Sequence, residues 1–368
     1  TATASATTAE SPSPSATASG PRAITGIFEE PRDNPATTKL TPPAGGAPTF
    51  QPVPSSNVVL FDIAAKKATD LGPGTLPSWA PASNKLAWVA TTQLQGEGDV
   101  KVMDFADGLS KTVAKGRAVR FLDADHVTFF PSGNDKVSLD LKTGATVRID
   151  GAADDQAYFG RLDAARMTTP DGLRLTRTDD PKAVQLPRGA VGSAVYRLTD
   201  TRTNAVVLEF RAFWALPAGK GTIVVASPVS AQVDRTNLFL VDVATARAEF
   251  IASTRWSYPM SLAADDSRVI WDDGFCSPTA GNVFAYERST KKLIEVDTGG
   301  KVWWLNLTPT GQVAVGEFGA KTLLDPTTFA TVVSLPERTG PLMGGDIAWS
   351  PDYRYAAYGI SGGHGGLC

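Results

Sequence analysis

One unit recurs along most of this chain of 368 residues and constrains its fold more than any other feature. In each copy a strand with alternating apolar residues ends near an acidic residue, a short turn follows, and a second alternating strand closes a hairpin. The seven copies begin at Asn57, Asp99, Lys136, Ala194, Asn237, Asn282 and Lys321. Their acidic residues are Asp62, Asp104, Asp140, Asp200, Asp242, Glu287 and Asp325. The mean spacing of about 44 residues is near the length of a four-stranded propeller blade, and the longest interval, Asp140 to Asp200, predicts an insertion.

A second two-strand unit lies between successive hairpins, and a last one follows the seventh hairpin. These units begin at Leu76, Arg120, Arg166, Phe213, Met260, Trp303 and Ile347. Their turns contain Pro, Asp, Gly and Asn, which supply the backbone angles of a tight reversal, and their strands are rich in Val, Ile and aromatic residues. No segment keeps a 3.6-residue period. Each repeat is therefore predicted to have four strands, in an all-β fold.

The order of the units predicts how the two ends of the repeat region meet. The region opens with an outer hairpin, residues 57–71, that lacks its inner strands. It ends with an inner pair, residues 346–360, that lacks its outer hairpin. Joining the two would complete one sheet and hide strand edges that would otherwise be open to aggregation. The predicted fold is a seven-bladed β-propeller with ring closure by the N- and C-terminal strands.

Two segments resemble a known repeat family. WSPDYRYAAY from Trp349 and TPDGLRLT from Thr169 are similar to the SPDG-x-x-IAF core of WD40-like (PD40) repeats, as found in the TolB-type β-propeller. The resemblance covers residues 57–368, with these two copies well matched and five degenerate. The G-H and W-D dipeptides of true WD40 repeats are absent at their places. The resemblance implies a propeller and does not imply a particular activity.

Residues 1–56 differ in composition from the rest of the chain. Residues 1–20 are rich in Ser, Thr, Ala and Pro with no large apolar residue, and Pro recurs up to residue 54. Such a segment cannot bury enough surface to offset its ordering entropy, so we predict a disordered tether over 1–56 and the propeller over 57–368. Ile24–Phe28 is the part of the tether expected to dock on the domain. The tether resembles the segment after the lipidated Cys of actinobacterial lipoproteins; the alternative is an ordinary secreted protein with a linker.

The composition bears on the compartment and on the partners. Net charge is −3, and Lys and Arg are scattered without a basic face, which argues against nucleic acid as a partner. No apolar stretch approaches the roughly 18 residues of a membrane span, and the chain begins at Thr1 without a leader. We interpret the sequence as a mature form whose export signal has been removed. The expected location is extracellular or at the cell surface, with membrane contact only through a lipid anchor, and the expected state is a monomer.

Cys276 and Cys368 are the only cysteines. A structural zinc site needs about four N or S ligands, and this chain has two Cys and two His, so no metal site is predicted. In an exported protein two such cysteines favour a disulfide, and both should lie on loops at the same face of the predicted propeller. The alternative is two unpaired thiols.

No catalytic motif is present. His126 enters a strand and is more easily explained as structural, and no G-x-S-x-G motif occurs. The recurring acidic residues are explained by hairpin turns, and no D-x-D-x-D-G calcium loop exists. We therefore expect no cofactor and no enzyme.

Exposed aromatic residues at loops are the better indication of a binding site. Trp256 and Tyr258 fall in a connection between predicted blades, on the face that carries Cys276. The candidate ligand-binding residues are Trp256, Tyr258, Asp272, Asp273, Phe275 and His364. The first functional hypothesis is a non-enzymatic cell-envelope or secreted propeller that binds a protein, peptide or glycan through one face. The alternatives are a propeller-type enzyme (lactonase, lyase or hydrolase) with a carboxylate or metal site at the central channel, and an accessory domain of an export or cell-wall assembly.

Overall fold

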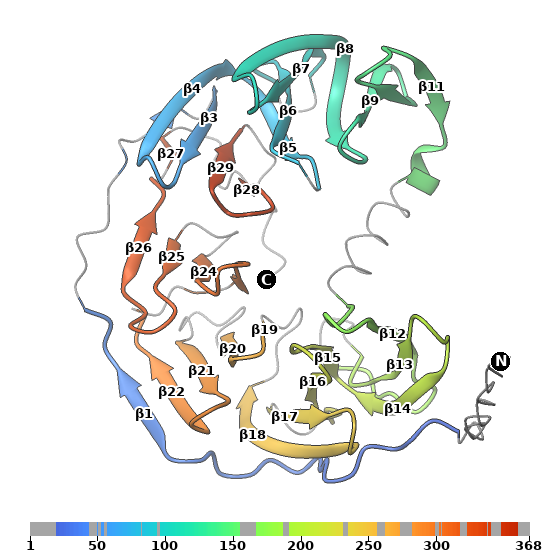
Figure 1. The fold of residues 1–368 in the computed structure, drawn as a ribbon, viewed down its shortest axis with the longest axis vertical. Coiled ribbons are helices and arrows are strands. Elements are labelled where there is room, and N and C mark those ends of the chain that lie inside the picture. Colours follow the sequence, from blue (N-terminus) through green and yellow to red (C-terminus); the bar gives the residue numbers. More distant parts are fainter. Residues whose placement is uncertain are drawn as a thin grey trace, which may run out of the picture.

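Strands dominate the computed structural model of the chain (Figure 1). The structure describes residues 20–43, 50, 53–54, 57–81, 83–93, 96–154, 167–186, 191–230, 235–255, 262–272, 282–298, 302, 304–316, 322–336, 338–339 and 347–359. Within these ranges, residues 151–154 are the α-helical residues. No helix in this part of the chain is long and apolar enough to span a bilayer. The prediction of an all-β fold is confirmed.

Most of the strands form antiparallel sheets that follow one another round an open arc (Figure 1). The first sheet joins β3 (Asn57–Asp62), β4 (Lys67–Pro73), β28 (Ala348–Trp349) and β29 (Tyr355–Tyr358). A seven-stranded sheet follows, with β5 (Thr75–Trp79), β6 (Lys85–Ala90), β7 (Gly98–Asp104), β8 (Leu109–Phe121), β9 (His126–Ser132), β10 (Asp135–Asp140) and β11 (Thr146–Ile149). Next comes a sheet of β12 (Leu173–Asp179), β13 (Ala194–Asp200) and β14 (Val206–Ala212).

Three further sheets continue the arc. One has β15 (Trp214–Pro217), β16 (Thr222–Ala226), β17 (Arg235–Asp242) and β18 (Arg247–Arg255). Another has β19 (Leu262–Ala264), β20 (Arg268–Asp272), β21 (Val283–Glu287) and β22 (Lys292–Val296), with β1 (Thr37–Leu40) added in parallel at its edge. The third has β23 (Trp304–Leu307), β24 (Val313–Gly316), β25 (Thr322–Leu324) and β26 (Thr331–Ser334). The short β2 (Val53–Pro54) and β27 (Arg338–Thr339) form a parallel pair.

All seven predicted hairpins are present as antiparallel pairs: β3–β4, β7–β8, β10–β11, β13–β14, β17–β18, β21–β22 and β25–β26. The acidic residue recurs because it organises the turn. Asp140 Oδ1, for example, accepts hydrogen bonds from the backbone N–H groups of Lys142 at 2.7 Å and Thr143 at 3.2 Å. These hydrogen bonds lower the pKa of Asp140. The turn is thus held by a side chain that the sequence repeats.

A left-handed residue completes each of these turns. It lies four positions after the acidic residue, and φ is from 54° to 73° at all seven: Lys66, Gly108, Gly144, Asn204, Ala246, Lys291 and Phe329. Only two of them are glycine, so five turns hold a side chain in a region that L-residues occupy at a cost of about 1 kcal/mol or more. The sequence repeat therefore reflects the acidic residue and the strands rather than a glycine signal.

The long strand β8 belongs to two hairpin units. Its first part pairs with β7 and its last part with β9. Gly116 lies where the strand changes partner, and a Cβ there would meet the Phe129 ring and the Phe130 carbonyl oxygen, each at 2.6 Å. Ala118 nearby has φ of 53°. The seven-stranded sheet therefore turns at β8 into two halves that pack on each other through Val102, Phe121 and Phe129.

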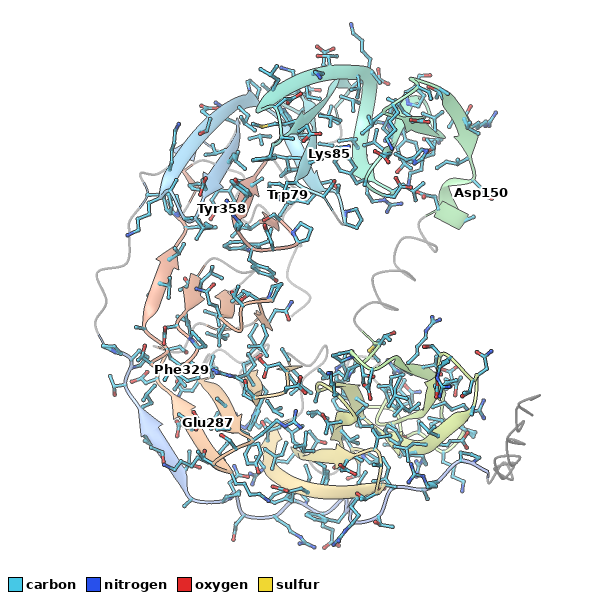
Figure 2. All side chains as sticks on the ribbon, viewed as in Figure 1. Trp79, Lys85, Asp150, Glu287, Phe329 and Tyr358 are labelled. Atoms are coloured by element: carbon cyan, nitrogen blue, oxygen red, sulfur yellow. The ribbon has the colours of Figure 1, made fainter. Side chains whose placement is uncertain are left out.

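The core lies between neighbouring sheets rather than at one centre. Six buried apolar clusters are formed by the described residues, and each joins consecutive sheets or the two halves of the seven-stranded sheet. Phe329 and Tyr358, labelled in Figure 2, belong to two of them, at the junctions on either side of β23–β26. Each sheet is thus buried on faces that touch its neighbours, as expected for radially arranged sheets.

Strands from the two ends of the repeat region share a sheet. β29 pairs with β3 in antiparallel register, with Ala357 opposite Leu60 and Tyr358 opposite Val59. The arc remains open in Figure 1 between β11 and β12, where residues 155–166 are outside the described part. The pairing of the terminal strands is present, whereas a closed ring of seven blades stays a prediction.

The N-terminal segment differs from the predicted tether over residues 20–40, here named the strap. The strap runs along the outermost strands of three consecutive sheets: Arg22 bridges to Leu208 of β14, Thr25 to Arg247 of β18, and β1 pairs with β22, all in parallel (Figure 1). Phe28 packs on Phe239 and Phe250, with ring centroids 4.9 and 5.4 Å away. The docking expected of Ile24–Phe28 is therefore seen, and the stretch that contacts the sheets is longer than predicted because backbone pairing adds to the apolar contact.

Candidate functional site

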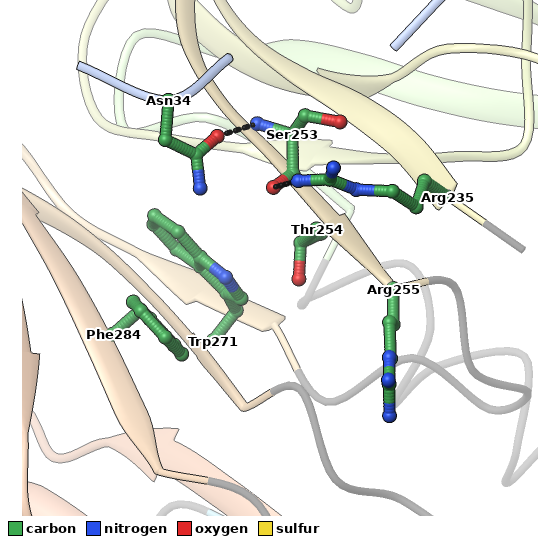
Figure 3. Close-up of a pocket in the computed structure, with 7 residues that line it drawn as sticks. All are labelled: Asn34, Arg235, Ser253, Thr254, Arg255, Trp271 and Phe284. Atoms are coloured by element: carbon green, nitrogen blue, oxygen red, sulfur yellow. Dashed lines mark hydrogen bonds between the residues drawn. The ribbon is translucent and has the colours of Figure 1, made fainter. Parts of the chain in front are cut away.

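A cavity of about 360 Å³ lies between two consecutive sheets, at the end where β18 and β20 finish (Figure 3). Its described lining comes from the β15–β18 sheet, from the β19–β22 sheet and from the strap. The residues are Asn34, Arg235, Ser253, Thr254, Arg255, Trp271 and Phe284. Two cross-strand pairs form most of it, one cationic and one aromatic.

The cationic pair is Arg235 and Arg255. They stand directly opposite each other where β17 begins and β18 ends. Residues opposite each other in an antiparallel pair point to the same face, and like charges in such a pair are destabilising. One nitrogen of Arg235 donates to the Ser253 carbonyl oxygen at 3.0 Å, and neither guanidinium forms an ion pair with any described residue. The sheet therefore presents two positive charges without a described counter-charge.

The aromatic pair is Trp271 on β20 and Phe284 on β21. These residues are also directly opposite, and their rings stack with centroids 5.7 Å apart at 12°. Trp271 is buried, and it belongs to the apolar cluster that joins the two sheets. Glu295 follows Phe284 across the sheet, and its carboxylate already contacts the Asn282 amide at 2.8 Å and Lys39 at 3.7 Å. The nearest acidic group in this row is therefore engaged elsewhere.

Further hydrogen-bonding groups line the cavity between these pairs. The Thr254 hydroxyl is buried and has no hydrogen-bond partner among the described residues. In Figure 3 it lies between Trp271 and Arg255. The Ser253 N–H donates to Asn34 Oδ1 at 2.5 Å, which leaves the Asn34 Nδ2 group as a donor on the cavity side. The strap thus contributes one wall of the site.

The structure describes only one of the six predicted ligand-binding residues. Asp272 follows Trp271 at the end of β20; it is fully buried and does not line the cavity. Trp256, Tyr258, Asp273, Phe275 and His364 lie outside the described residues, as do Cys276 and Cys368. The sequence prediction did not include Arg235, Thr254 or Asn34. Arg235 is recognised as a site residue by the register of β17 on β18, which places it opposite Arg255. The alternation of apolar residues in the sequence does not give that register.

Other polar clusters of the described residues are internally paired. Asp154 accepts from Arg120 at 2.5 Å and from Lys136 at 2.8 Å, in a setting where Lys136 is buried. Glu249 accepts from the Tyr286 hydroxyl at 2.6 Å and from Lys291 at 2.9 Å. Burial raises the pKa of Tyr286, and the hydrogen bond to Glu249 adds to this. These groups already hold their partners, in contrast to the two arginines.

Two further cavities in the described part of the chain are less distinctive. One, of about 470 Å³, is lined by Asp242, Arg247, Glu249 and Arg288 among others, so that charges of both signs face it. The other, of about 440 Å³, lies beside the end of the strap and is lined by apolar and polar residues alike, with Asp297 as the charged residue among those described. No group of three or more His, Cys, Asp or Glu that could hold a metal ion occurs in the described ranges.

Comparisons with known proteins give structural likeness only. No protein-family model matches the chain, and no curated protein matches it. An acylaminoacyl peptidase from Pyrococcus horikoshii is 13% identical with a TM-score of 0.36 over 74% of this chain and 47% of that one. The β-propeller domain of the trilobed protease from Pyrococcus furiosus is 10% identical with a TM-score of 0.36, over 75% and 85%. An uncharacterized protein from Listeria monocytogenes is 11% identical with a TM-score of 0.40, over 83% and 99%.

The chain spans about half the length of the acylaminoacyl peptidase that it matches. Propeller-type proteins recur among these neighbours, but the TM-scores are low, so the description as a β-propeller depends on the antiparallel sheets and the clusters between them. The likeness says nothing about the activity of this chain.

Proposed function

We propose that this chain is a non-enzymatic β-propeller of the cell envelope, secreted or held at the surface, that binds a protein, peptide or glycan. The ligand site is the cavity between the β15–β18 and β19–β22 sheets. The observation that carries this proposal is the cationic pair, Arg235 and Arg255, facing a cavity whose other wall is aromatic. Such a combination binds ligands by charge and stacking and needs no acid–base chemistry.

The proposed architecture is a closed ring of seven blades. Apart from the two-stranded β2–β27 pair, counting the two halves of the seven-stranded sheet separately yields seven sheet units among the described residues, and the pairing of β29 with β3 supports closure through the termini. In this arrangement the ends of β18 and β20, beside which the cavity lies, belong to one face of the ring, and we take that face as the binding face.

The experiment uses the full chain and a bacterial cell-envelope fraction. Retention of the chain on the insoluble fraction is compared for the wild type, Arg255→Glu and Arg174→Glu. Arg174 is an exposed residue of β12, on a different sheet. Arg174→Glu alters the net charge by the same amount as Arg255→Glu and therefore serves as the control. We expect retention to fall about tenfold or more for Arg255→Glu and to stay unchanged for Arg174→Glu. Equal retention of all three proteins would contradict the site.

The enzymatic alternative is an outcome of the same experiment. The soluble phase is analysed for new sugars, peptides or ring-opened lactones after incubation. Release that depends on the wild-type chain, at a rate that Arg255→Glu does not change, would favour an enzyme with its site elsewhere and would overturn the non-enzymatic proposal.

A further inference from the structure

We infer that the cavity is a carboxylate-binding subsite, assembled from the Arg235–Arg255 pair, the Thr254 hydroxyl and the strap residue Asn34. This inference rests on the proposed function, because it names the chemical class that the proposed ligand presents. In the free protein, two like charges on adjacent strands destabilise the sheet. Arg235 and Arg255 are directly opposite on adjacent strands, a like-charge pairing that destabilises a sheet, and an anion bound in the cavity that both line reduces that cost.

The donors available in the cavity fit an oxyanion. A guanidinium group offers up to five N–H donors in a planar fork, and one of those on Arg235 is used by the Ser253 carbonyl. The Thr254 hydroxyl is more than nine-tenths buried and has no partner among the described residues. A buried hydroxyl without a partner destabilises the free protein, and a ligand oxygen that accepts from it would remove that cost. Asn34 Nδ2 adds a further donor from the strap.

The aromatic wall favours a carboxylate over a phosphate. Trp271 and Phe284 cover one side of the cavity with stacked aromatic rings, whose carbon faces offer a charged group no hydrogen bond. Moving a second negative charge of a phosphate next to this wall adds a desolvation cost that a monoanion avoids. A carboxylate is planar, matches the guanidinium fork with two parallel hydrogen bonds, and leaves the rest of the ligand to pack on the rings. Acidic sugars and peptide C-termini both carry this group.

The test titrates the full-length chain with pairs of small probes by isothermal titration calorimetry. One pair is glucuronate and glucose; the other is N-acetylphenylalanine and its amide. We expect one acid to bind and its neutral counterpart to bind about tenfold more weakly or worse, with affinity falling as salt rises. The acid that binds identifies the source as a sugar or a peptide. Phosphate binding more tightly than both acids, or equal binding of acids and neutral probes, would overturn the inference.

Variants connect the binding to the two arginines. Arg255→Gln and, as a second variant, Arg235→Gln should each weaken the acid about tenfold, and Arg174→Gln should have no effect. Without ligand, Arg255→Gln should melt at the same temperature as the wild type or higher, because the substitution removes the repulsion. The acid should raise the melting temperature of the wild type and of Arg174→Gln, and should raise that of Arg255→Gln and Arg235→Gln much less. A lower melting temperature for unliganded Arg255→Gln would show that the pair is structural and would overturn the inference.

A last arm separates this inference from the proposed function. The carboxyl groups of the envelope fraction are converted to neutral amides, and retention of the wild-type chain is measured again. Loss of retention supports a carboxylate ligand. Retention that still depends on Arg255 but survives amidation would leave the binding site in place and overturn its carboxylate chemistry.

Discussion

The outer strands of the arc are protected in two different ways. Those of three consecutive sheets, β14, β18 and β22, contact the strap and are partly or fully buried along much of their length. The outer strands β4 and β11 do not pair with the strap, and both are largely exposed. The first part of β8 is exposed as well and carries Lys111. Charged, short or Gly/Pro-ended edge strands resist pairing with another chain, and an apolar edge needs a cover.

This difference shows that the strap belongs to the folded domain. Phe28 fills a place beside Phe239 and Phe250 that would otherwise expose two aromatic rings. Arg22 donates to the carbonyl oxygens of Ala244 at 2.6 Å and Val243 at 2.7 Å. The Asn237 amide donates to the carbonyl oxygens of Phe28 and Glu30. The predictions below test the comparison of the strap-covered and strap-free sheets.

The largest effect is expected from removing the strap. Deletion of residues 1–40 exposes the Phe239 and Phe250 rings and several backbone groups, so stability should fall on the order of 5 kcal/mol and the chain should self-associate. Urea unfolding and light scattering measure the two effects. Deletion of residues 1–19 is the control and should change neither. If both deletions behave alike, the strap does not stabilise the covered sheets.

The next effect concerns the strap-free end of the arc, where Asp154 joins Arg120 and Lys136 in a largely buried ionic cluster. Asp154→Ala removes the carboxylate that accepts from Arg120 and from the buried Lys136, and breaking a buried ion pair costs about 3 kcal/mol or more. The control is Asp135→Ala, whose partner Arg148 is exposed. That loss should be below about 1 kcal/mol. Equal losses in urea unfolding would mean that the cluster is not buried in solution.

Acid should weaken the strap-covered side through Asp180. Burial would raise the pKa of this carboxyl group, but hydrogen bonds from Ser193, the Lys182 N–H and Arg211 outweigh burial and lower the pKa to about 2. Because the folded-state pKa lies below the unfolded value, the stabilisation is complete above about pH 4 and is lost as the pH falls toward 2. It amounts to about 2 kcal/mol. Urea midpoints at pH 5 and pH 3 should differ by more for the wild type than for Asp180→Asn.

The smallest effect is expected at the left-handed turn residue, which strap-covered and strap-free hairpins have in common. Lys66→Gly, in a strap-free hairpin, should raise stability by up to about 1 kcal/mol because φ is 54° there. Lys291→Gly, in a strap-covered hairpin, should gain less, since it also removes the contact with Glu249. Gly108→Ala is the reverse control and should destabilise. A loss of stability in Lys66→Gly would refute the argument from backbone strain.

Much of the fold could be predicted because its units are local. Each hairpin needs an alternating strand, an acidic residue that accepts turn N–H groups, and a second strand, and all three are contiguous in the chain. Even the pairing of the terminal strands followed from counting units, since an outer hairpin without inner strands needs a partner. The docking of residues 29–40 could not be predicted in this way. Its contacts are to backbone groups of β18 and β22, which lie about 200 residues or more further along the chain.

The candidate site shows most clearly what the sequence pattern cannot predict. The turn at Asp242 pairs that residue with Arg247, and an unbroken register would place Arg235 opposite Thr254. A shift between Leu238 and Phe239 moves the pairing by one residue, so that Arg235 faces Arg255. A bulge of this kind inverts the face on which later side chains lie, and it depends on packing across the sheet.

By itself the sequence determined the strands, their turns and their order, because alternation and acidic turn residues act over a few residues. Only the tertiary structure decided which sheets meet, where the strap lies and which charges face each other. The physical reason is distance along the chain: Asn34, Arg255 and Trp271 form one cavity because three separate elements pack together, and no local pattern encodes that packing.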